Sequence, residues 1–169
     1  RAGFPLDLEL QYLQRFCEKN NLQLKQISVP DFDQLIPKLL AGEGDIISAN
    51  LTVTREREKQ VSFSDSLLQT HEYLLMGKNS PSLKIGQDLN GREVVIQKGK
   101  SHLITAQGLL KAYPKLRIRT IAADISTESI YDKLTNGEYD LAIQDKNLLN
   151  SALKYRNDIK ISLQASGKR

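Results

Sequence analysis

The sequence predicts an α/β protein built from two similar lobes, and the main evidence is a turn unit that occurs twice. Residues 40–47 (LAGEGDII) and 135–143 (TNGEYDLAI) both indicate the end of a helix, a glycine stop, an acidic turn and an apolar strand. Helical periodicity also alternates with short apolar runs, which is typical of α/β domains. Aligning the two units places Asn50 opposite Asp145. Taken alone, the turn has an alternative explanation, because such helix-to-strand turns recur without kinship.

The elements of the first lobe follow from periodicity and turn chemistry. Lobe 1 is predicted to span residues 1–77, with the crossing to the next lobe in the polar loop 77–86. We expect helices over 1–21, 35–40 and 55–59, and strands over 22–29, 46–51 and 72–76. Asp31 and Asp33 are expected to be capping residues, and Thr54 is expected to be the N-cap of the third helix.

The second lobe, residues 78–158, is expected to repeat this alternation. We predict a turn over 88–91 and strands over 93–97, 116–121 and 139–143. We also predict three helices: one that follows the loop 98–102 and ends near residue 110, one capped by Ser126, and one over 148–155. Residues 159–169 are predicted to hold a strand, over 159–163, that crosses back toward lobe 1.

Composition and charge narrow the class of partner. The chain has 169 residues and a net charge of +4, and its lysines and arginines alternate with acids, so we expect no nucleic-acid binding. No apolar run approaches the roughly 20 residues that span a bilayer, so we expect no transmembrane segment in this chain. The lack of a signal peptide and of a starting Met suggests a mature or excised piece. Cys17 is expected to be a small core residue.

The loop Gly99-Lys100-Ser101, between a predicted strand and a predicted helix, invites comparison with phosphate-binding loops. That motif needs a glycine five positions before Gly99, where Val94 stands, so nucleotide binding is not supported. Ser101 and the amides after it lie at a predicted helix N-terminus, which favours an anionic group such as a carboxylate. The alternative role of Ser101 is that of an N-cap only.

Catalysis and metal binding find little support in the spacing of residues. His71 and His102 have no Cys, His or Glu at metal-ligand spacing, so we expect no metal site and no cofactor. Ser101 beside His102 offers the atoms of a serine hydrolase, but no G-x-S-x-G elbow surrounds the serine. A Ser/His hydrolase is therefore the less favoured alternative to a binding protein.

Arg57 and Asp145 form the most informative pair of charges. Each follows one of the two similar apolar runs, and open α/β sheets bind small ligands beyond the ends of such strands. Together they complement a zwitterion, because a guanidinium pairs with a carboxylate and a carboxylate receives an ammonium. The sequence does not choose Arg57 over Arg55, and both members of the pair have the alternative role of surface charges.

Five motifs in fixed order resemble the family 3 extracellular solute-binding proteins. They are GFPLDLELQYLQRF, DFDQLIPKLLAGEGDIISANLTVTRERE, VSFSDS, DLNGREVVIQKGKSH and NGEYDLAIQD. The resemblance implies a bilobal periplasmic-binding-protein-like fold of type II, in which two α/β lobes joined by two crossing strands hold an amino acid in their cleft. LTVTRERE, GKSHL and AYPKL are most similar to the sensor domains of membrane-bound lytic murein transglycosylases.

The resemblance also implies ligand contacts, residue by residue. Arg57 is expected to pair with the α-carboxylate of the ligand, helped by Thr52 and by Ser101 across the cleft. Phe32 corresponds to the aromatic residue that covers the ligand side chain, and His102 lies beside the site.

At the amino end of the ligand, Asp145 is expected to bind the ammonium, and Asn50 and Ala49 to surround it mainly with backbone groups. In the resembling enzymes this domain precedes a lysozyme-like catalytic domain. The implied function is therefore a non-catalytic periplasmic or extracytoplasmic sensor for an amino-acid-like or muropeptide ligand, associated with the outer membrane through its parent protein. The alternative is a free-standing amino-acid-binding protein of an ABC importer. The first strand of the family, before the GF motif, has no counterpart here, so we expect lobe 1 to lack it.

Overall fold

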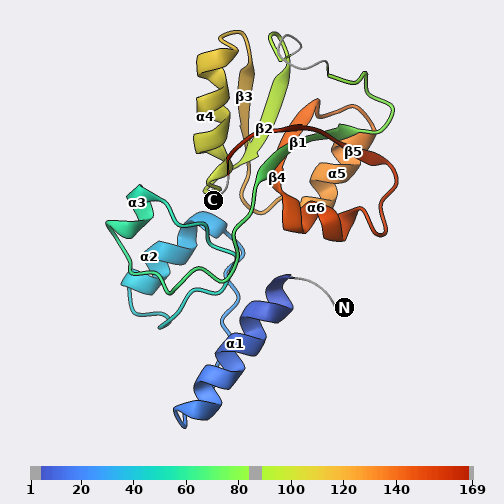
Figure 1. Ribbon diagram of the computed structural model, residues 1–169. Coiled ribbons are helices and arrows are strands. Elements are labelled where there is room, and N and C mark those ends of the chain that lie inside the picture. The colour runs from blue at the N-terminus through green and yellow to red at the C-terminus, as the bar shows by residue number, and fades with distance from the viewer. Residues whose placement is uncertain (1–4, 84–88, 168–169) are drawn as a thin grey trace. The chain divides into compact units, whose positions relative to one another are not determined.

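The computed structural model describes residues 5–83 and 89–167, with backbone only for residues 5–7. Contacts divide the chain into two compact units, unit 1 (Arg1–Leu68) and unit 2 (Gln69–Arg169), which Figure 1 draws from blue to red along the chain. The predicted lobe limits at residues 77 and 158 stay a prediction. The strand expected to end lobe 1 is hydrogen-bonded into the sheet of unit 2.

Unit 1 consists of short helices joined by extended segments. Its elements are α1 (Pro5–Lys19), the 3₁₀-helix η1 (Phe32–Gln34), α2 (Leu35–Leu40) and α3 (Arg55–Glu58). The three predicted helices are confirmed, although residues 1–4 of the first prediction lie outside the described residues. Thr54 is confirmed as the N-cap of α3, because its Oγ1 accepts the backbone N–H of Arg57 at 3.3 Å. Asp31 precedes η1 without a capping hydrogen bond from its side chain.

The two strands predicted within residues 22–51 are wrong. No described residue of unit 1 belongs to a strand, and Ile27 and Ile46 are 53% and 57% exposed. A strand is stable only where a neighbour accepts and donates its backbone hydrogen bonds, and neither segment has such a neighbour among the described residues of unit 1. Cys17, expected in a core, is only partly buried.

Unit 2 contains a mixed five-stranded sheet in the order β3-β2-β4-β1-β5. The strands are β1 (Glu72–Gly77), β2 (Glu93–Gln97), β3 (Arg117–Ile121), β4 (Leu141–Asp145) and β5 (Ile159–Gln164). β2 runs parallel to β3 and β4, whereas β1 runs antiparallel to β4 and β5. Every strand predicted for residues 72–163 is present, with ends shifted by at most two residues, which confirms the α/β class.

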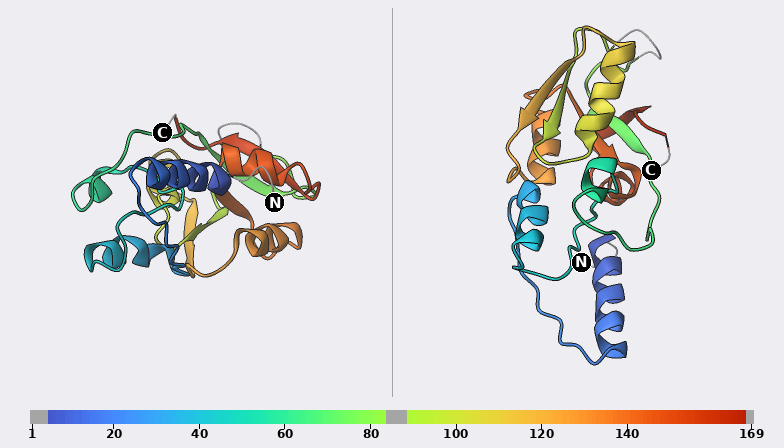
Figure 2. Two further views of the ribbon diagram at one scale, coloured as in Figure 1. Left: turned by 90° about the horizontal axis from the view of Figure 1, so that it is seen from below. Right: turned by 90° about the vertical axis from the view of Figure 1, so that its left-hand side faces the viewer.

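Helices cover both faces of this sheet, so unit 2 has three layers (Figures 1 and 2). Leu74 and Ile143 point to one face and pack with Ala106 of α4 (His102–Ala112). Their neighbours Leu75 and Ala142 point to the other face and pack with α5 (Thr127–Thr135) and α6 (Lys146–Ala152). This alternation follows from the pleat, in which successive side chains leave a strand on opposite sides. The same alternation determines which polar residues at the strand ends lie on the face of the sheet that α4 covers.

Two predicted caps in unit 2 have different outcomes. Ser126 is confirmed as the N-cap of α5, because its Oγ accepts the backbone N–H of Ser129 at 3.1 Å. Ser101 precedes α4, but its side chain makes no capping hydrogen bond. The turn predicted over 88–91 falls partly outside the described residues, and its described part ends at Gly91 with φ +84°.

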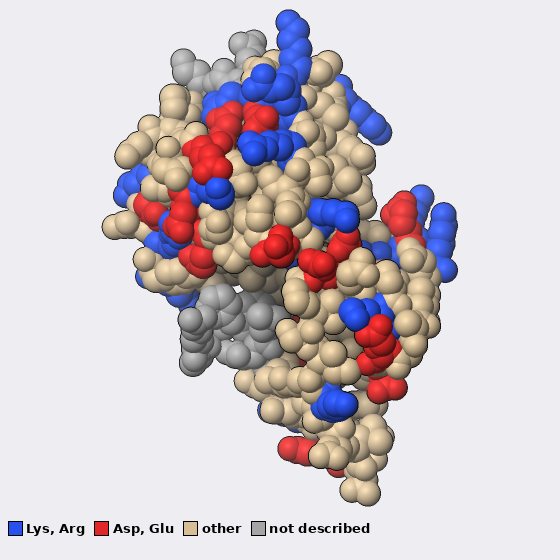
Figure 3. All heavy atoms as spheres, turned by 180° about the vertical axis from the view of Figure 1, so that it is seen from behind, with Lys and Arg blue, Asp and Glu red and all other residues tan. Residues whose placement is uncertain are grey.

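The surface carries interspersed charge. On the face drawn in Figure 3, acidic and basic side chains alternate instead of forming blocks of one sign. Arg156, for example, is paired with Glu128, Asp132 and Asp158. Among the described residues, no helix is both long and apolar enough to cross a bilayer.

Candidate functional site

In unit 1, the structure brings together three of the residues expected to contact a ligand. The Arg57 guanidinium donates from Nη1 to the Thr52 carbonyl oxygen at 2.8 Å, and its Cζ lies 5.7 Å from the centre of the Phe32 ring. Burial lowers the pKa of Arg57 from its ordinary value, but the group stays charged at neutral pH. Arg55 on the same helix is exposed. The structure therefore distinguishes the two arginines that the sequence left open.

Asn50 and Ala49 lie half-buried on the segment before Thr52. Asn50 has a φ of +51°, a left-handed conformation that asparagine tolerates better than most residues. Its backbone N–H donates to both carboxylate oxygens of Glu9 on α1, at 3.0 and 3.2 Å, and Ser48 Oγ donates to the same carboxylate at 2.8 Å. Glu9 therefore holds this segment in place, and the sequence analysis missed it.

In unit 2, the other three expected residues form a buried group. Ser101, His102 and Asp145 are 8%, 8% and 6% exposed. His102 begins α4 and Asp145 ends β4, and His102 Nε2 lies 3.5 Å from Asp145 Oδ2. Within the described part of the chain, no donor makes a hydrogen bond to the Asp145 carboxylate. Leaving a buried carboxylate without hydrogen-bond donors costs free energy.

Glu72 joins this group, and sequence reasoning did not find it. It begins β1, is 1% exposed, and lies directly opposite Asp145 in the antiparallel pairing of β1 with β4. Thr105 on α4 donates from Oγ1 to Glu72 Oε2. Ligand-type atoms of Glu72, His102 and Asp145 all lie within 4.8 Å of one another. The sequence feature that could have indicated Glu72 is its position as an acidic residue at the start of the otherwise apolar strand EYLLM.

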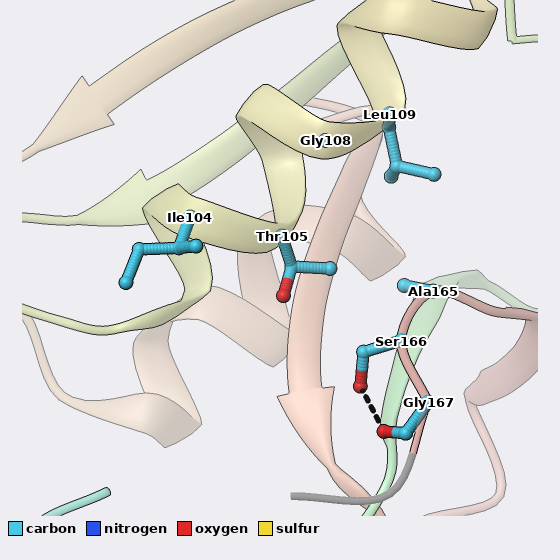
Figure 4. A pocket seen from close by; sticks show the side chains of 7 residues that line it. All are labelled: Ile104, Thr105, Gly108, Leu109, Ala165, Ser166 and Gly167. Atoms are coloured by element: carbon cyan, nitrogen blue, oxygen red, sulfur yellow. Dashed lines mark hydrogen bonds between the residues drawn. The ribbon is translucent and has the colours of Figure 1, made fainter. Parts of the chain in front are cut away.

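A pocket of about 350 Å³ lies beside this group, between α4 and the segment that follows β5 (Figure 4). Thr105 lines it from α4, and Ser166 lines it from the opposite side. The Glu72 backbone N–H donates to Ser166 Oγ at 3.0 Å, so hydroxyls from both walls of the pocket bind Glu72. The other lining residues are Ile104, Gly108, Leu109, Ala165 and Gly167.

The geometry does not assemble a serine hydrolase from the described residues. A serine nucleophile needs a hydrogen bond to its base. Ser101 Oγ makes no such bond to the His102 imidazole among the described residues, and His102 Nε2 faces Asp145 instead.

The comparison with protein families identifies the chain. Residues 2–112 match the family described as bacterial extracellular solute-binding proteins, family 3. The chain belongs to this family, which confirms the resemblance of its motifs.

The chain is similar to relatives of two kinds. Membrane-bound lytic murein transglycosylase F of Desulfosudis oleivorans is 24% identical over 158 residues, which cover 94% of this chain and 34% of the relative. The lysine/arginine/ornithine-binding periplasmic protein of Escherichia coli is 28% identical over 149 residues, which cover 86% of this chain and 52% of the relative. The chain thus spans between a third and about half of the length of these relatives.

Solved structures share the fold. An ancestral arginine-binding protein bound to arginine superposes with a TM-score of 0.77 at 24% identity, over 95% of this chain and 72% of that chain. The periplasmic VFT2 domain of BvgS from Bordetella pertussis gives a TM-score of 0.74 at 22% identity, over 92% and 64% of the two chains. This likeness confirms the predicted fold class, that of the bilobal periplasmic-binding-protein-like α/β proteins.

Proposed function

We propose that this domain binds an amino-acid-like or muropeptide ligand in the periplasm. The observation that carries the proposal is the position of Arg57, whose guanidinium is held against the Phe32 ring and on the Thr52 carbonyl oxygen. A guanidinium oriented in this way is suited to pair with a carboxylate, because its planar fork matches the two carboxylate oxygens. The α-carboxylate of the ligand is therefore assigned to Arg57, with assistance from Ser101.

The amino end of the ligand is assigned to Asp145. Its carboxylate is 9% exposed and accepts no hydrogen bond from the described residues, so an ammonium supplies the donors that it lacks. Asn50 and Ala49 contribute backbone groups near the ammonium, and His102 adjusts the specificity beside it. Closure on the ligand, which the family resemblance implies, is proposed as the signal, because a ligand shifts a conformational equilibrium by its differential affinity for the two states.

The signal is proposed to regulate a lytic murein transglycosylase. This proposal is supported by the similarity to lytic murein transglycosylase F, of which the matched region is about a third. A lysozyme-like domain elsewhere in the parent protein is the partner that this role requires. The role makes the present domain a non-catalytic sensor.

The second candidate is a binding protein that delivers amino acids to an ABC importer. It is supported by the similarity to the lysine/arginine/ornithine-binding protein. The two candidates differ in ligand. A sensor of cell-wall turnover binds muropeptides more tightly than free amino acids, whereas an importer component shows the opposite order.

Thermal unfolding against a panel of free amino acids and muropeptides, in the presence of EDTA, tests the proposal. A ligand at about 100 times its dissociation constant stabilises the chain by about 2.7 kcal/mol. The shift is expected to disappear in Arg57→Ala. Arg55→Ala is the matched control, because Arg55 lies on the same helix but is exposed, and this variant is expected to keep the shift. A shift that survives in Arg57→Ala, or no shift with any compound, contradicts the assigned site.

A further inference from the structure

We propose that Glu72, His102 and Asp145 form a binding site for a divalent transition-metal ion, with zinc as the fitting ion. The proposal stands independently of the proposed function, because all three residues belong to unit 2 and the site needs no amino-acid ligand. Spacing along the chain predicts no metal site, because these three residues are 30 and 43 positions apart.

The pleat of two strands explains why the carboxylates meet. Leu74 of β1 and Ile143 of β4 pack in the core on the α4 side of the sheet. Side chains two positions away on a strand leave on the same side, so Glu72 and Asp145 also face α4. They lie directly opposite each other in the strand pairing. His102 enters the same space from the first turn of α4.

The distances match the requirements of a zinc site. In a tetrahedral site with bonds of about 2.0–2.2 Å, ligand atoms lie about 3.3–3.6 Å apart. His102 Nε2 and Asp145 Oδ2 are 3.5 Å apart, and the ligand atoms of all three residues lie within 4.8 Å of one another. Side-chain shifts of about 1 Å therefore bring the three atoms to coordinating positions around one ion.

The chemistry of the group favours an ion. Carboxylates that lie directly opposite each other on neighbouring strands repel, and a divalent cation bound by both replaces this repulsion with attraction. One imidazole nitrogen with two carboxylate oxygens suits zinc, whereas magnesium and calcium prefer oxygen ligands alone. Asp145 also lacks a hydrogen-bond donor among the described residues. Three protein ligands leave a fourth position for water.

Thr105 supports the arrangement from α4. Its hydroxyl donates to Glu72 Oε2, which orients that carboxylate within the buried group. The site shares Asp145 with the proposed ammonium contact. Zinc and the ammonium of a ligand are therefore expected to compete, so added zinc lowers the apparent affinity for that ligand.

Equilibrium dialysis of the 169-residue chain against zinc alone, without amino acid or muropeptide, tests the site. The wild type is expected to bind one zinc ion per chain. Glu72→Gln, His102→Gln and Asp145→Asn are each expected to weaken binding by at least about tenfold. His71→Gln and Cys17→Ser are the matched controls, because they remove the other histidine and the single thiol, and both are expected to bind as the wild type does.

Cobalt provides a second measurement that does not depend on the folding of any variant. Wild-type chain loaded with Co²⁺ is expected to show the intensified visible absorption of a four-coordinate site, without the thiolate band that Cys17 would add. Several outcomes overturn the proposal: no zinc bound by the wild type, unchanged affinity in a Glu72→Gln chain with a native circular dichroism spectrum, or loss of binding in a control. If the zinc site is contradicted, the thermal-unfolding result with the ligand panel in EDTA still stands. The two proposals can therefore be contradicted independently of each other.

Discussion

The turn unit at residues 38–50 and its counterpart at residues 133–145 have the same local structure. Both contain a glycine with positive φ, +75° at Gly42 and +80° at Gly137. The glycine N–H donates three residues back in each case, to Leu39 and to Leu134. A lysine of the preceding helix pairs with the turn glutamate in both units.

Beyond the turn, the two copies differ. Residues 141–145 form β4, which lies between β2 and β1 and is buried throughout, with Leu141 fully buried. Residues 46–50 form no strand, and Ile46, which aligns with Leu141, is 57% exposed. The comparison shows that the helix stop and the turn are local properties. The strand after them forms only where other strands flank it.

The aspartate at the end of the turn also differs between the two copies: Asp140 is held by tertiary contacts, whereas Asp45 is exposed. Asp140 accepts hydrogen bonds from the Arg92 guanidinium and from the backbone N–H of Glu93, at the start of β2. Burial alone raises the pKa of Asp140, but these hydrogen bonds and the Arg92 charge lower it below its ordinary value. The aligned Asp45 is exposed.

The largest contrast is expected from truncating the aligned apolar residues. Leu141→Ala creates a cavity in the core and is expected to lower the free energy of unfolding of unit 2 by about 2–5 kcal/mol. Ile46→Ala removes an exposed side chain and is expected to change the stability by less than about 0.5 kcal/mol. Urea titration of both variants measures the difference. Equal losses would show that residues 46–50 are buried as β4 is.

A smaller contrast is expected at the aligned aspartates. Asp140→Asn is expected to destabilise unit 2 by about 1 kcal/mol at pH 7, a value reduced for the partial exposure of the Arg92 pair. Asp45→Asn is expected to have almost no effect. Because the folded pKa of Asp140 is lowered, its contribution is present above the unfolded pKa of about 3.9 and is lost as the pH falls through the lower folded value.

Thermal melts of wild type and Asp140→Asn from pH 7 to pH 2 measure this dependence. The gap between the two melting temperatures is expected to be constant down to about pH 5 and to narrow below about pH 4. A gap that widens on acidification would contradict the assigned direction of the pKa shift.

The smallest effect is expected where the two copies agree. Glu43→Gln and Glu138→Gln each remove a solvent-exposed lysine–glutamate pair and are expected to lower the melting temperature only slightly and by similar amounts. Melts at low and at high salt measure both, and salt is expected to remove most of the difference from wild type. A clearly larger loss in one copy would show that its turn depends on tertiary contacts.

The strands β1, β2 and β4 were predictable because they contain continuous apolar runs that are buried on both faces. In β3 and β5, apolar residues alternate with polar ones, which is the pattern of more exposed strands. The segments 22–29 and 46–51 carry a similar apolar pattern, but the described part of unit 1 offers no strand to pair with them. Among the candidate site residues, charge and position indicated Asp145 and one of the two arginines Arg55 and Arg57. Glu72 was missed, because only the pairing of β1 with β4 places it opposite Asp145.

The sequence alone indicated the family to which the chain belongs, but it predicted some helix ends only approximately: a helix expected over 148–155 is α6 (Lys146–Ala152). It also indicated where the helices lie, the glycine turns, and the caps at Thr54 and Ser126. These features depend on backbone preferences and on hydrogen bonds between residues close in the chain. The folded structure was needed to show which apolar run forms a strand and which arginine packs on Phe32. It was also needed to show that Glu72, His102 and Asp145 share one buried space. Burial and strand pairing depend on neighbours that are distant in sequence, so no local pattern specifies them.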